Sequence, residues 1–332
     1  MDLEGAGTAP RRLLSRSPAP VRFAVAAAEL ARLRATRRRV GLALVYHRVA
    51  ERAGDPAHEL NPAVAADAFA RQMSFVARTF LPVLASALPS IVAARRRGDP
   101  IPLAVTFDDD LPEHARVAAP LLSRHRIPAT FFLCGSFLGG ERRFWWDDLQ
   151  AAVDAGTLRA DDLPGAAEAL ARRPRAIHAV AKAIEELAPD ERAAVARVLA
   201  ERAAPHRPAQ RLTAEDARAL ASSHEIGFHT RRHDRLVGLD EAALAERVSD
   251  GRAELEALAG GSLTAIAYPH GKADARVAAV ARDAGFAAGY TGVHAAFADG
   301  DDELLIGRVE PRAGQGLGRF AWTIARVLRA AG

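Results

Sequence analysis

The chain of 332 residues is 49% hydrophobic and 26% charged, which is the composition of an ordinary globular protein that can bury a large core. Its 45 basic and 41 acidic residues give a net charge of only +4, so we expect no nucleic-acid partner. A single cysteine excludes an intrachain disulfide and a metal site built from cysteines. A reducing compartment therefore suits the chain but is not required.

The first 40 residues are predicted to form a basic extension with a helix over 22–39. Glu29 and Arg32 interrupt its apolar residues, so the sequence does not predict a signal peptide. No run of about 18 apolar residues, as a membrane-crossing helix requires, occurs in the chain. A second basic helix is expected over 319–331. These features predict a cytoplasmic protein, and peripheral association of the two basic helices with a membrane stays an open alternative.

Beyond residue 40, short apolar segments alternate with Ala-rich helical patterns. Strands are predicted at 42–47, 102–109, 129–135, 225–230, 263–271, 287–292 and 304–311. Helices are predicted between most of them, including 240–261, with Asp240 as its N-cap, and 272–286. This alternation indicates an α/β protein with parallel strands, and about seven repeats favour a barrel over two doubly wound halves.

One interval, at about 139–222, interrupts the alternation because it contains several helical patterns and no convincing strand. Thr213 and Asp216 have the spacing of a capping box at the start of one of these helices. We interpret the interval as a helical insertion that either shapes a substrate groove or only elaborates the structure. The chain then consists of an extension over 1–40 and one domain over 41–332.

Side chains that can carry chemistry fall at the carboxyl ends of the predicted strands. In a parallel α/β barrel the loops after these ends converge on one face, where active sites lie. The residues at or just beyond four different strands are His47, Asp108, Asp109, His229 and His270. Their coincidence predicts a single site.

The segment "HTRRH" provides the expected partner for the acidic segment "TFDDD" (106–110). His229 and His233 are four residues apart, a spacing that would place both imidazoles on one side of a helical turn. Two histidines and one carboxylate would leave positions open for water and substrate, as a catalytic metal site requires. The two segments together predict a divalent metal ion, with zinc as the expected one.

Three motifs in this order, "TFDDD", "HTRRH" and "AYPHG", resemble the polysaccharide deacetylases, also called the NodB-homology or carbohydrate esterase family 4 group. The resemblance extends over about 41–311. It implies a distorted (β/α) barrel of seven or eight strands with the helical insertion. It also implies metal-assisted removal of the acetyl group from an N-acetylated amino sugar in a polysaccharide, glycolipid or glycoconjugate precursor.

The resemblance also implies a role for each motif residue. Asp108 is expected to be the general base, because a carboxylate that binds the cation is a poor base and a second one must accept the proton of water. The expected metal ligands are Asp109, His229 and His233. From "AYPHG", the backbone N–H of His270 is expected to donate to the oxyanion, and Tyr268 is assigned to the same substrate region.

The leaving amine needs a general acid, and the last predicted strand lacks the histidine that most members of the family carry. His47 resembles the corresponding residue of a circularly permuted subset and is the expected acid. A buried histidine bonded to the backbone is the structural alternative, and His294 is a second choice for the acid. Ala267 replaces the arginine that usually orients the base, so Arg308 is expected to orient Asp108.

Asp110 stands where the family usually has glycine. Aspartate tolerates a positive φ better than most residues, and its charge could raise the pKa of Asp108. Trp145 and Trp146 could either stack on a sugar or pack in the core.

Two other classes of function remain open. The acids Asp108 and Asp110 form a D-x-D pattern, which can hold the metal of a nucleotide diphosphate in a glycosyltransferase; that reading gives the two histidines no role. A non-catalytic sugar-binding relative would have lost the base or a ligand, and all of these are present. The favoured partner is therefore an N-acetylated sugar.

Overall fold

The computed structural model describes residues 18–135, 138, 144–203 and 211–331. Residues 1–17 of the expected extension, and 139–143 and 204–210 of the expected insertion, lie outside the described residues.

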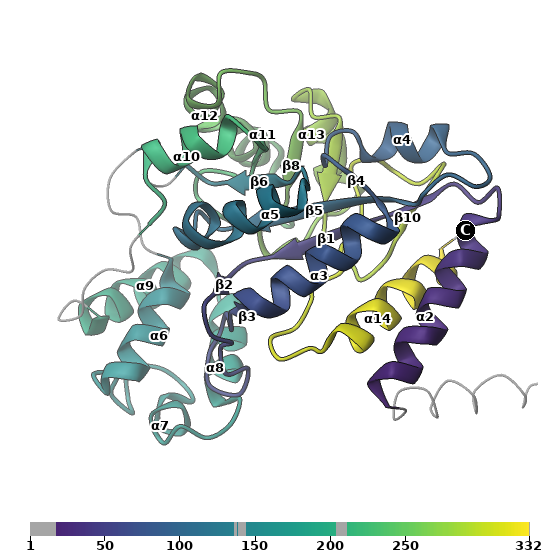
Figure 1. Cartoon of the computed structure of the whole chain (residues 1–332). Helices are drawn as coiled ribbons and strands as arrows, with labels where there is room; N and C mark the ends of the chain where they lie inside the picture. The colour runs from purple at the N-terminus through teal and green to yellow at the C-terminus, as the bar shows by residue number, and fades with distance from the viewer. Residues whose placement is uncertain (1–17, 136–137, 139–143, 204–210, 332) are drawn as a thin grey trace, which may run out of the picture.

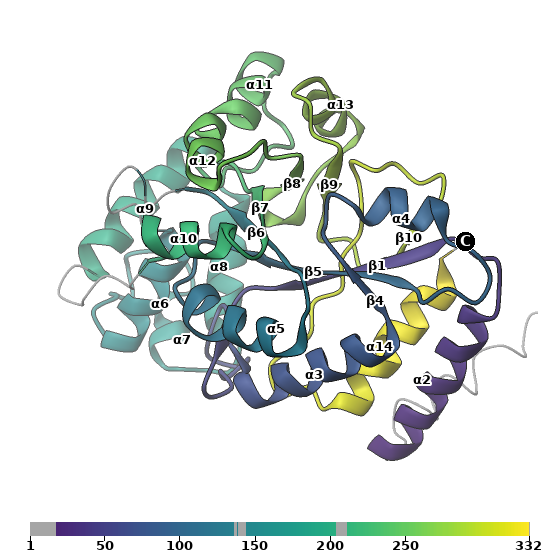
Figure 2. The same cartoon turned by 45° about the horizontal axis from the view of Figure 1, so that its top comes forward.

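The domain is built on a curled, mainly parallel sheet with helices packed around it (Figures 1 and 2). Its strands are β1 (Val40–Tyr46), β4 (Leu81–Val83), β5 (Pro102–Asp108), β6 (Thr130–Leu133), β7 (Glu225–Phe228), β8 (Ala265–Ala267), β9 (Ala288–Tyr290) and β10 (Phe297–Ala298). The order is β10-β1-β5-β6-β7-β8-β9, with β4 paired to β5 and β10 antiparallel to β1. The strands β2 (Val49–Ala50) and β3 (Val64–Ala65) form a separate pair. The prediction of an α/β distorted barrel is confirmed.

Both faces of the central strands are buried, which explains why the strands are continuous apolar runs in the sequence. In β1, Leu42 and Leu44 belong to the large core under the helices, whereas Ala43 packs with Ala104 and Phe132 on the opposite, inner face. Because side chains alternate along a strand, the residues that follow on the inner face point into the barrel mouth. This alternation decides which polar side chains reach the site described below.

The helices around the sheet are α2 (Ala19–Arg34), α3 (Ala66–Thr79), α4 (Leu88–Ala94), α5 (Ala119–His125) preceded by η1 (His114–Ala118), α10 (Ala214–Ala221), α11 (Glu241–Ser249), α12 (Arg252–Ala259), α13 (Ala275–Asp283) and α14 (Leu317–Ala330). The basic helices expected at 22–39 and 319–331 correspond to α2, which ends earlier than expected at Arg34, and to α14. The two pack side by side (Figure 1). Gly318 permits their close approach, because a Cβ atom there would lie 2.4 Å from the carbonyl oxygen of Ala19. Among the described residues, no helix is long and apolar enough to cross a membrane.

The predicted caps are confirmed: the Asp240 side chain accepts from the N–H of Ala243, and Thr213 and Asp216 form a capping box. The single helix predicted over 240–261 is wrong. It divides into α11 and α12 because Gly251, with φ of 80°, interrupts the helical backbone between them.

The last predicted strand, 304–311, is also wrong as a regular strand. The segment pairs with β9 through Ile306 and Tyr290, and then with β1 through Val309 and Leu44, each time as a single bridge. It therefore lies between β9 and β1, but it changes neighbour too soon to build a continuous ladder.

Four further helices form a separate layer beside the barrel mouth: α6 (Trp145–Ala155), α7 (Ala166–Leu170), α8 (Ala176–Glu186) and α9 (Pro189–Ala203). They have a hydrophobic core of their own, which includes Leu149, Ile177 and Leu199. Figure 1 shows them as a teal group beside β2 and β3. Their position brings α8 to the rim of the cavity that holds the predicted site residues.

Candidate active site

The strand ends open into one cavity of about 840 Å³. Asp108 is the last residue of β5, His47 follows β1, and His229 follows β7. His270 lies in the short helix η3 (Pro269–Gly271) after β8. All of these residues line the cavity together with Asp109 and His233, as the sequence predicted.

Asp109, His229 and His233 form a compact, buried group of potential ligands. The Oδ1 atom of Asp109 lies 3.3 Å from Nε2 of His229 and 3.4 Å from Nε2 of His233. One donor atom from each of the three residues lies within 4.8 Å of the others. Within the described part of the chain, Oδ1 of Asp109 has no hydrogen-bond partner. An unpartnered, buried carboxylate oxygen facing two imidazole nitrogens fits a divalent cation.

The backbone fixes the orientation of His229. Its Nδ1 atom lies 2.8 Å from the carbonyl oxygen of Ala267 and donates to it, which leaves the lone pair of Nε2 directed at Asp109. Metal-binding histidines commonly have such a partner on the second ring nitrogen.

The surroundings favour the protonation states that bind a metal. Burial would raise the pKa of Asp109, but His229 and His233 hold it well below its usual value. Burial lowers the pKa of His233 to about 4, so that ring is neutral at physiological pH. Burial also opposes a proton on His229, but Asp108 and Asp109 outweigh it and raise the pKa of that ring. A cation among these groups would replace that proton.

The local conformation between the two histidines differs from the expected helical turn. Residues 231–232 form a tight turn, and Thr230 and His233 have φ angles of 53° and 51°. The two rings still converge, with centroids 4.7 Å apart. The prediction that the rings meet is confirmed, whereas the helical reason for it is wrong.

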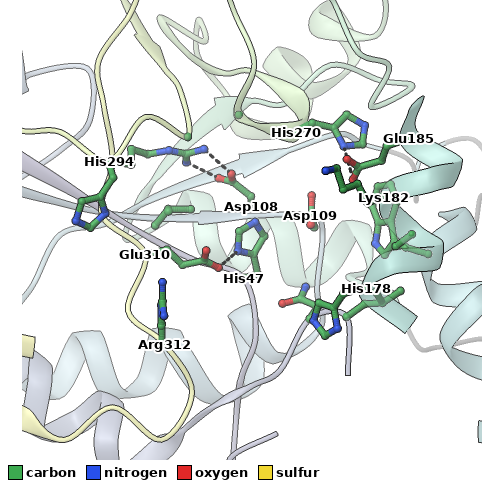
Figure 3. Close-up of a pocket in the computed structure, with 18 of the residues that line it drawn as sticks. His47, Asp108, Asp109, His178, Lys182, Glu185, His270, His294, Glu310 and Arg312 are labelled. Atoms are coloured by element: carbon green, nitrogen blue, oxygen red, sulfur yellow. Dashed lines mark hydrogen bonds and ion pairs between the residues drawn. The ribbon is translucent and has the colours of Figure 1, made fainter. Parts of the chain in front are cut away.

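Asp108 is held by a bidentate ion pair with Arg308. The two guanidinium nitrogens donate to Oδ1 and Oδ2 at 2.9 and 2.8 Å, and both side chains are buried. Figure 3 marks these bonds as dashed lines at Asp108. Arg308 also donates to the carbonyl oxygen of Thr291 and to the hydroxyl of Thr106. Burial would raise the pKa of Asp108, but Arg308 holds it below its usual value. The expected contact between Arg308 and Asp108 is therefore present, and Asp108 is ionised at neutral pH.

Asp110 does not act on Asp108 as expected. Its φ is 49°, and its Oδ1 atom accepts a hydrogen bond of 2.8 Å from the N–H of Cys134. The third acid thus caps the end of β6, and the pKa of Asp108 is lowered instead of raised.

Breaking the buried pair should be costly for stability. We expect Arg308→Met to lower the free energy of unfolding by about 3–5 kcal/mol, because Asp108 would be left buried without a partner. Urea denaturation measures this change. The double variant Arg308→Met/Asp108→Asn is the control and should recover much of the loss, since it removes the unpaired charge. Equal stability of Arg308→Met and the wild type would contradict this reading of the pair.

His47 faces a carboxylate that the sequence analysis missed. Its Nδ1 atom lies 3.2 Å from Oε1 of Glu310 (Figure 3). Burial would lower the pKa of His47, but Glu310 and the two site aspartates raise it to about 9. The carbonyl oxygen of His47 is 2.9 Å from Nε2 of the buried His114, which fixes the backbone there. His47 is therefore protonated at neutral pH, as a general acid must be.

The two residues of "AYPHG" assigned to the substrate region lie in different places, His270 at the cavity and Tyr268 in the outer core. His270 lines the cavity with φ of 56°, and within the described residues its backbone N–H donates to no other group. Its ring lies 3.6 Å from Glu185 of α8. Tyr268, assigned to the substrate region, does not line the cavity: it is fully buried in the outer core and donates to the carbonyl oxygen of Leu304 at 2.8 Å. It shares the outer face with Ile266, as strand alternation requires.

The remaining predicted residues lie around the rim. Trp145 and Trp146 both line the cavity, and the ring centroid of Trp146 is 4.8 Å from that of His233. Trp145 also packs on the core of the helical layer. His294 lines the cavity on the side opposite Lys182 and Glu185, the same side as Arg312 (Figure 3).

The chain is similar to known proteins in sequence pattern and in fold. A family model described as polysaccharide deacetylase matches residues 95–160 and 181–289, which is more than half of the chain. No curated protein matches the chain.

Solved structures share the fold. The Streptococcus pyogenes deacetylase PplD in complex with acetate is 14% identical, with a TM-score of 0.60 over 87% of this chain and 98% of that one. IcaB from Ammonifex degensii is 18% identical, with a TM-score of 0.55 over 88% and 97%. A polysaccharide deacetylase from Bacillus cereus is 16% identical, with a TM-score of 0.54 over 86% and 69%.

These comparisons leave the circular permutation a prediction. The match of the family model, together with the shared barrel, establishes the family. The chain belongs to the polysaccharide deacetylase family and is a hydrolase that acts on carbon–nitrogen bonds.

Proposed function

We propose that the protein removes the acetyl group from an N-acetylated amino sugar of a polysaccharide, glycolipid or glycoconjugate precursor, with a divalent cation, expected to be zinc, held by Asp109, His229 and His233. The observation that carries this proposal is the convergence of three groups in one cavity: a buried ligand set, a carboxylate held by arginine, and an imidazole that faces Glu310. A cytoplasmic location and peripheral membrane binding stay predictions from the sequence.

The division of roles follows from the contacts. A cation bound there would polarise the acetyl carbonyl and lower the pKa of a water molecule. Asp108, which is paired with Arg308 and is not one of the three ligands, accepts the proton as the water oxygen attacks the acetyl carbon. His270 lines the cavity, and its backbone N–H, which has no acceptor among the described residues, would donate to the negative charge that develops on the carbonyl oxygen.

The second half of the reaction needs a proton on nitrogen. As the carbon–nitrogen bond breaks, the amide nitrogen takes the electron pair and accepts a proton from His47. The products are acetate and the free amine of the sugar. Glu310 keeps the imidazole protonated until that step.

The geometry does not favour a glycosyltransferase. The D-x-D pattern would need Asp108 and Asp110 on the same cation. Asp108 is instead bound to Arg308, and Asp110 accepts from the backbone of Cys134. The inert sugar-binding alternative is decided by the activity assay below.

The pH dependence tests the role of Glu310. Removing its charge in Glu310→Gln lowers the pKa of His47, so the acid form is lost at a lower pH. We expect the alkaline limb of the kcat/KM profile to shift down by about one pH unit, the size of effect typical of one nearby charge. Glu241→Gln, on the outer helix α11, is the control and should leave the limb in place. An unshifted limb in Glu310→Gln would exclude His47 as the group that titrates there.

The proposed reaction is tested by acetate release from purified, zinc-loaded protein. We expect acetate and an equal amount of free amine from N-acetylglucosamine oligosaccharides and conjugates, and none from N-acetyl-lysine peptides. Release of acetate from the peptides alone would contradict the sugar substrate. Full metal loading without acetate from any sugar would favour the inert binding relative.

A further inference from the structure

One wall of the cavity carries positive charge that the proposed reaction does not use. The wall extends outward from His47 and Asp108, on the side opposite α8 (Figure 3). Its cavity-lining residues are His294, Arg312, Gln315, Arg319, Thr323 and Arg326. We call this set the cationic wall.

The chain connects this wall directly to the catalytic residues. Arg308 reaches Asp108 and Glu310 reaches His47, so alternate residues of this segment face the cavity. Arg312 follows in the same alternation, about 6–7 Å farther along an extended chain. The helix α14 then adds Arg319, Thr323 and Arg326 at spacings of four and three residues, which place them on one face. The backbone that carries the wall is therefore continuous with the segment that holds the catalytic residues.

The arginines of the wall lack partners. Within the part of the chain that the structure describes, no carboxylate pairs with the guanidinium of Arg312, Arg319 or Arg326, and these groups donate no hydrogen bond. Other arginines near the cavity are paired, as Arg308 is with Asp108 and Arg211 with Asp147. Unpaired guanidinium groups that share a concave surface repel one another unless an anion joins them.

His294 gives an independent indication that these charges converge. Its pKa is lowered first by burial and then by the positive charges of Arg326 and Arg312. The two arginines thus lie close enough to act on one imidazole, although one belongs to α14 and the other to the segment that precedes it. The positive charges of Arg312 and Arg326 therefore act on the same part of the cavity, around His294.

We propose that the cationic wall binds a phosphate or diphosphate group attached to the amino sugar. This inference rests on the proposed function and narrows its substrate to a phosphorylated, and not a neutral, sugar. The planar guanidinium matches phosphate oxygens with two parallel hydrogen bonds, and several arginines suit a group with more than one negative charge. A neutral glycan would leave these three exposed guanidinium groups without an ionic partner. The phosphate can belong to a sugar nucleotide or to a lipid-linked sugar, which share this chemistry.

Steady-state kinetics with matched substrates test the inference. The substrates are N,N′-diacetylchitobiose as the neutral sugar, UDP-N-acetylglucosamine as the nucleotide-linked sugar, and prenyl-diphosphate N-acetylglucosamine in detergent as the lipid-linked sugar. We expect kcat/KM to be at least about tenfold higher for one of the diphosphates than for chitobiose, because each charged hydrogen bond is worth about a factor of ten. The preferred diphosphate identifies the source of the phosphate.

Two variants separate specific binding from general charge. In Arg319→Gln/Arg326→Gln, the ratio of kcat/KM for the diphosphate to that for chitobiose should fall by about tenfold or more, mainly through KM. Arg329→Gln removes an exposed charge from the same helix outside the cavity and should leave the ratio unchanged. Thermal unfolding of each variant checks that the helix pair remains folded.

The outcomes separate the two proposals. Acetate from chitobiose with no preference for either diphosphate, or an equal loss on all substrates in the double variant, would overturn the phosphate site and leave deacetylation standing. A ratio that falls equally in Arg329→Gln would also overturn it, because the effect would be long-range charge alone. No acetate from any of the three sugars would overturn the proposed function and the phosphate site with it.

Discussion

Asp108→Asn is expected to reduce the rate of acetate release by about 10³-fold while leaving the bound metal in place. The asparagine keeps the size of the side chain but cannot accept the proton of water. Asp108 contacts Arg308 and is not part of the ligand set, so metal content should not fall. Acetate release and metal content by mass spectrometry, measured on the same protein sample, check both parts of this prediction.

The matched control is Asp283→Asn, an exposed aspartate at the end of α13, which should retain full activity. If Asp108→Asn kept more than about a tenth of the wild-type rate, Asp108 could not be the general base. If it lost the metal, Asp108 would be a ligand, and the division of roles between the two acids would be wrong.

His229→Ala should remove both the metal and the activity. The ring supplies one of three ligand atoms, and its Nδ1 bond to the carbonyl oxygen of Ala267 fixes its direction. A bound cation stabilises the transition state by several kcal/mol. Its loss should therefore raise the activation free energy enough to slow acetate release by at least about 10³-fold. Equilibrium dialysis against zinc, followed by the activity assay, provides the measurement.

His125→Ala, at the surface end of α5, is the control for loss of an imidazole and should bind zinc as the wild type does. Near-wild-type zinc affinity in His229→Ala, with activity lost, would place the cation elsewhere. Activity that survives without zinc would exclude metal assistance altogether.

The site residues that lie at the ends of strands could be predicted from the sequence. Apolar runs that end in acids or histidines mark the carboxyl ends of parallel strands, and such ends must meet at one edge. Asp108 and His47 continue the inner face of β5 and β1, whereas Phe107 and Tyr46 face the outer core. The same alternation places Tyr268 with Ile266 in the outer core. The strand pattern alone therefore argues against a place for Tyr268 in the substrate region.

Other features of the site depend on contacts between distant parts of the chain, which no local sequence pattern predicts. Glu310 meets His47 across most of the chain, and it does so because residues 304–311 change partner from β9 to β1. That change of partner also explains why the segment is not a regular strand. The turn at 231–232 brings His229 and His233 together through positive φ angles, which the spacing alone cannot reveal. The cationic wall likewise appears only when α14 is placed beside the cavity.

The most direct test of the central claim is a crystal structure of the zinc-loaded protein with anomalous diffraction at the zinc edge. The account predicts one strong peak at about 2.0–2.2 Å from a carboxylate oxygen of Asp109 and from Nε2 of both His229 and His233. Asp108 should remain paired with Arg308, outside the coordination sphere. A peak bound by Asp108, or the absence of a peak between these three residues at saturating zinc, would contradict it.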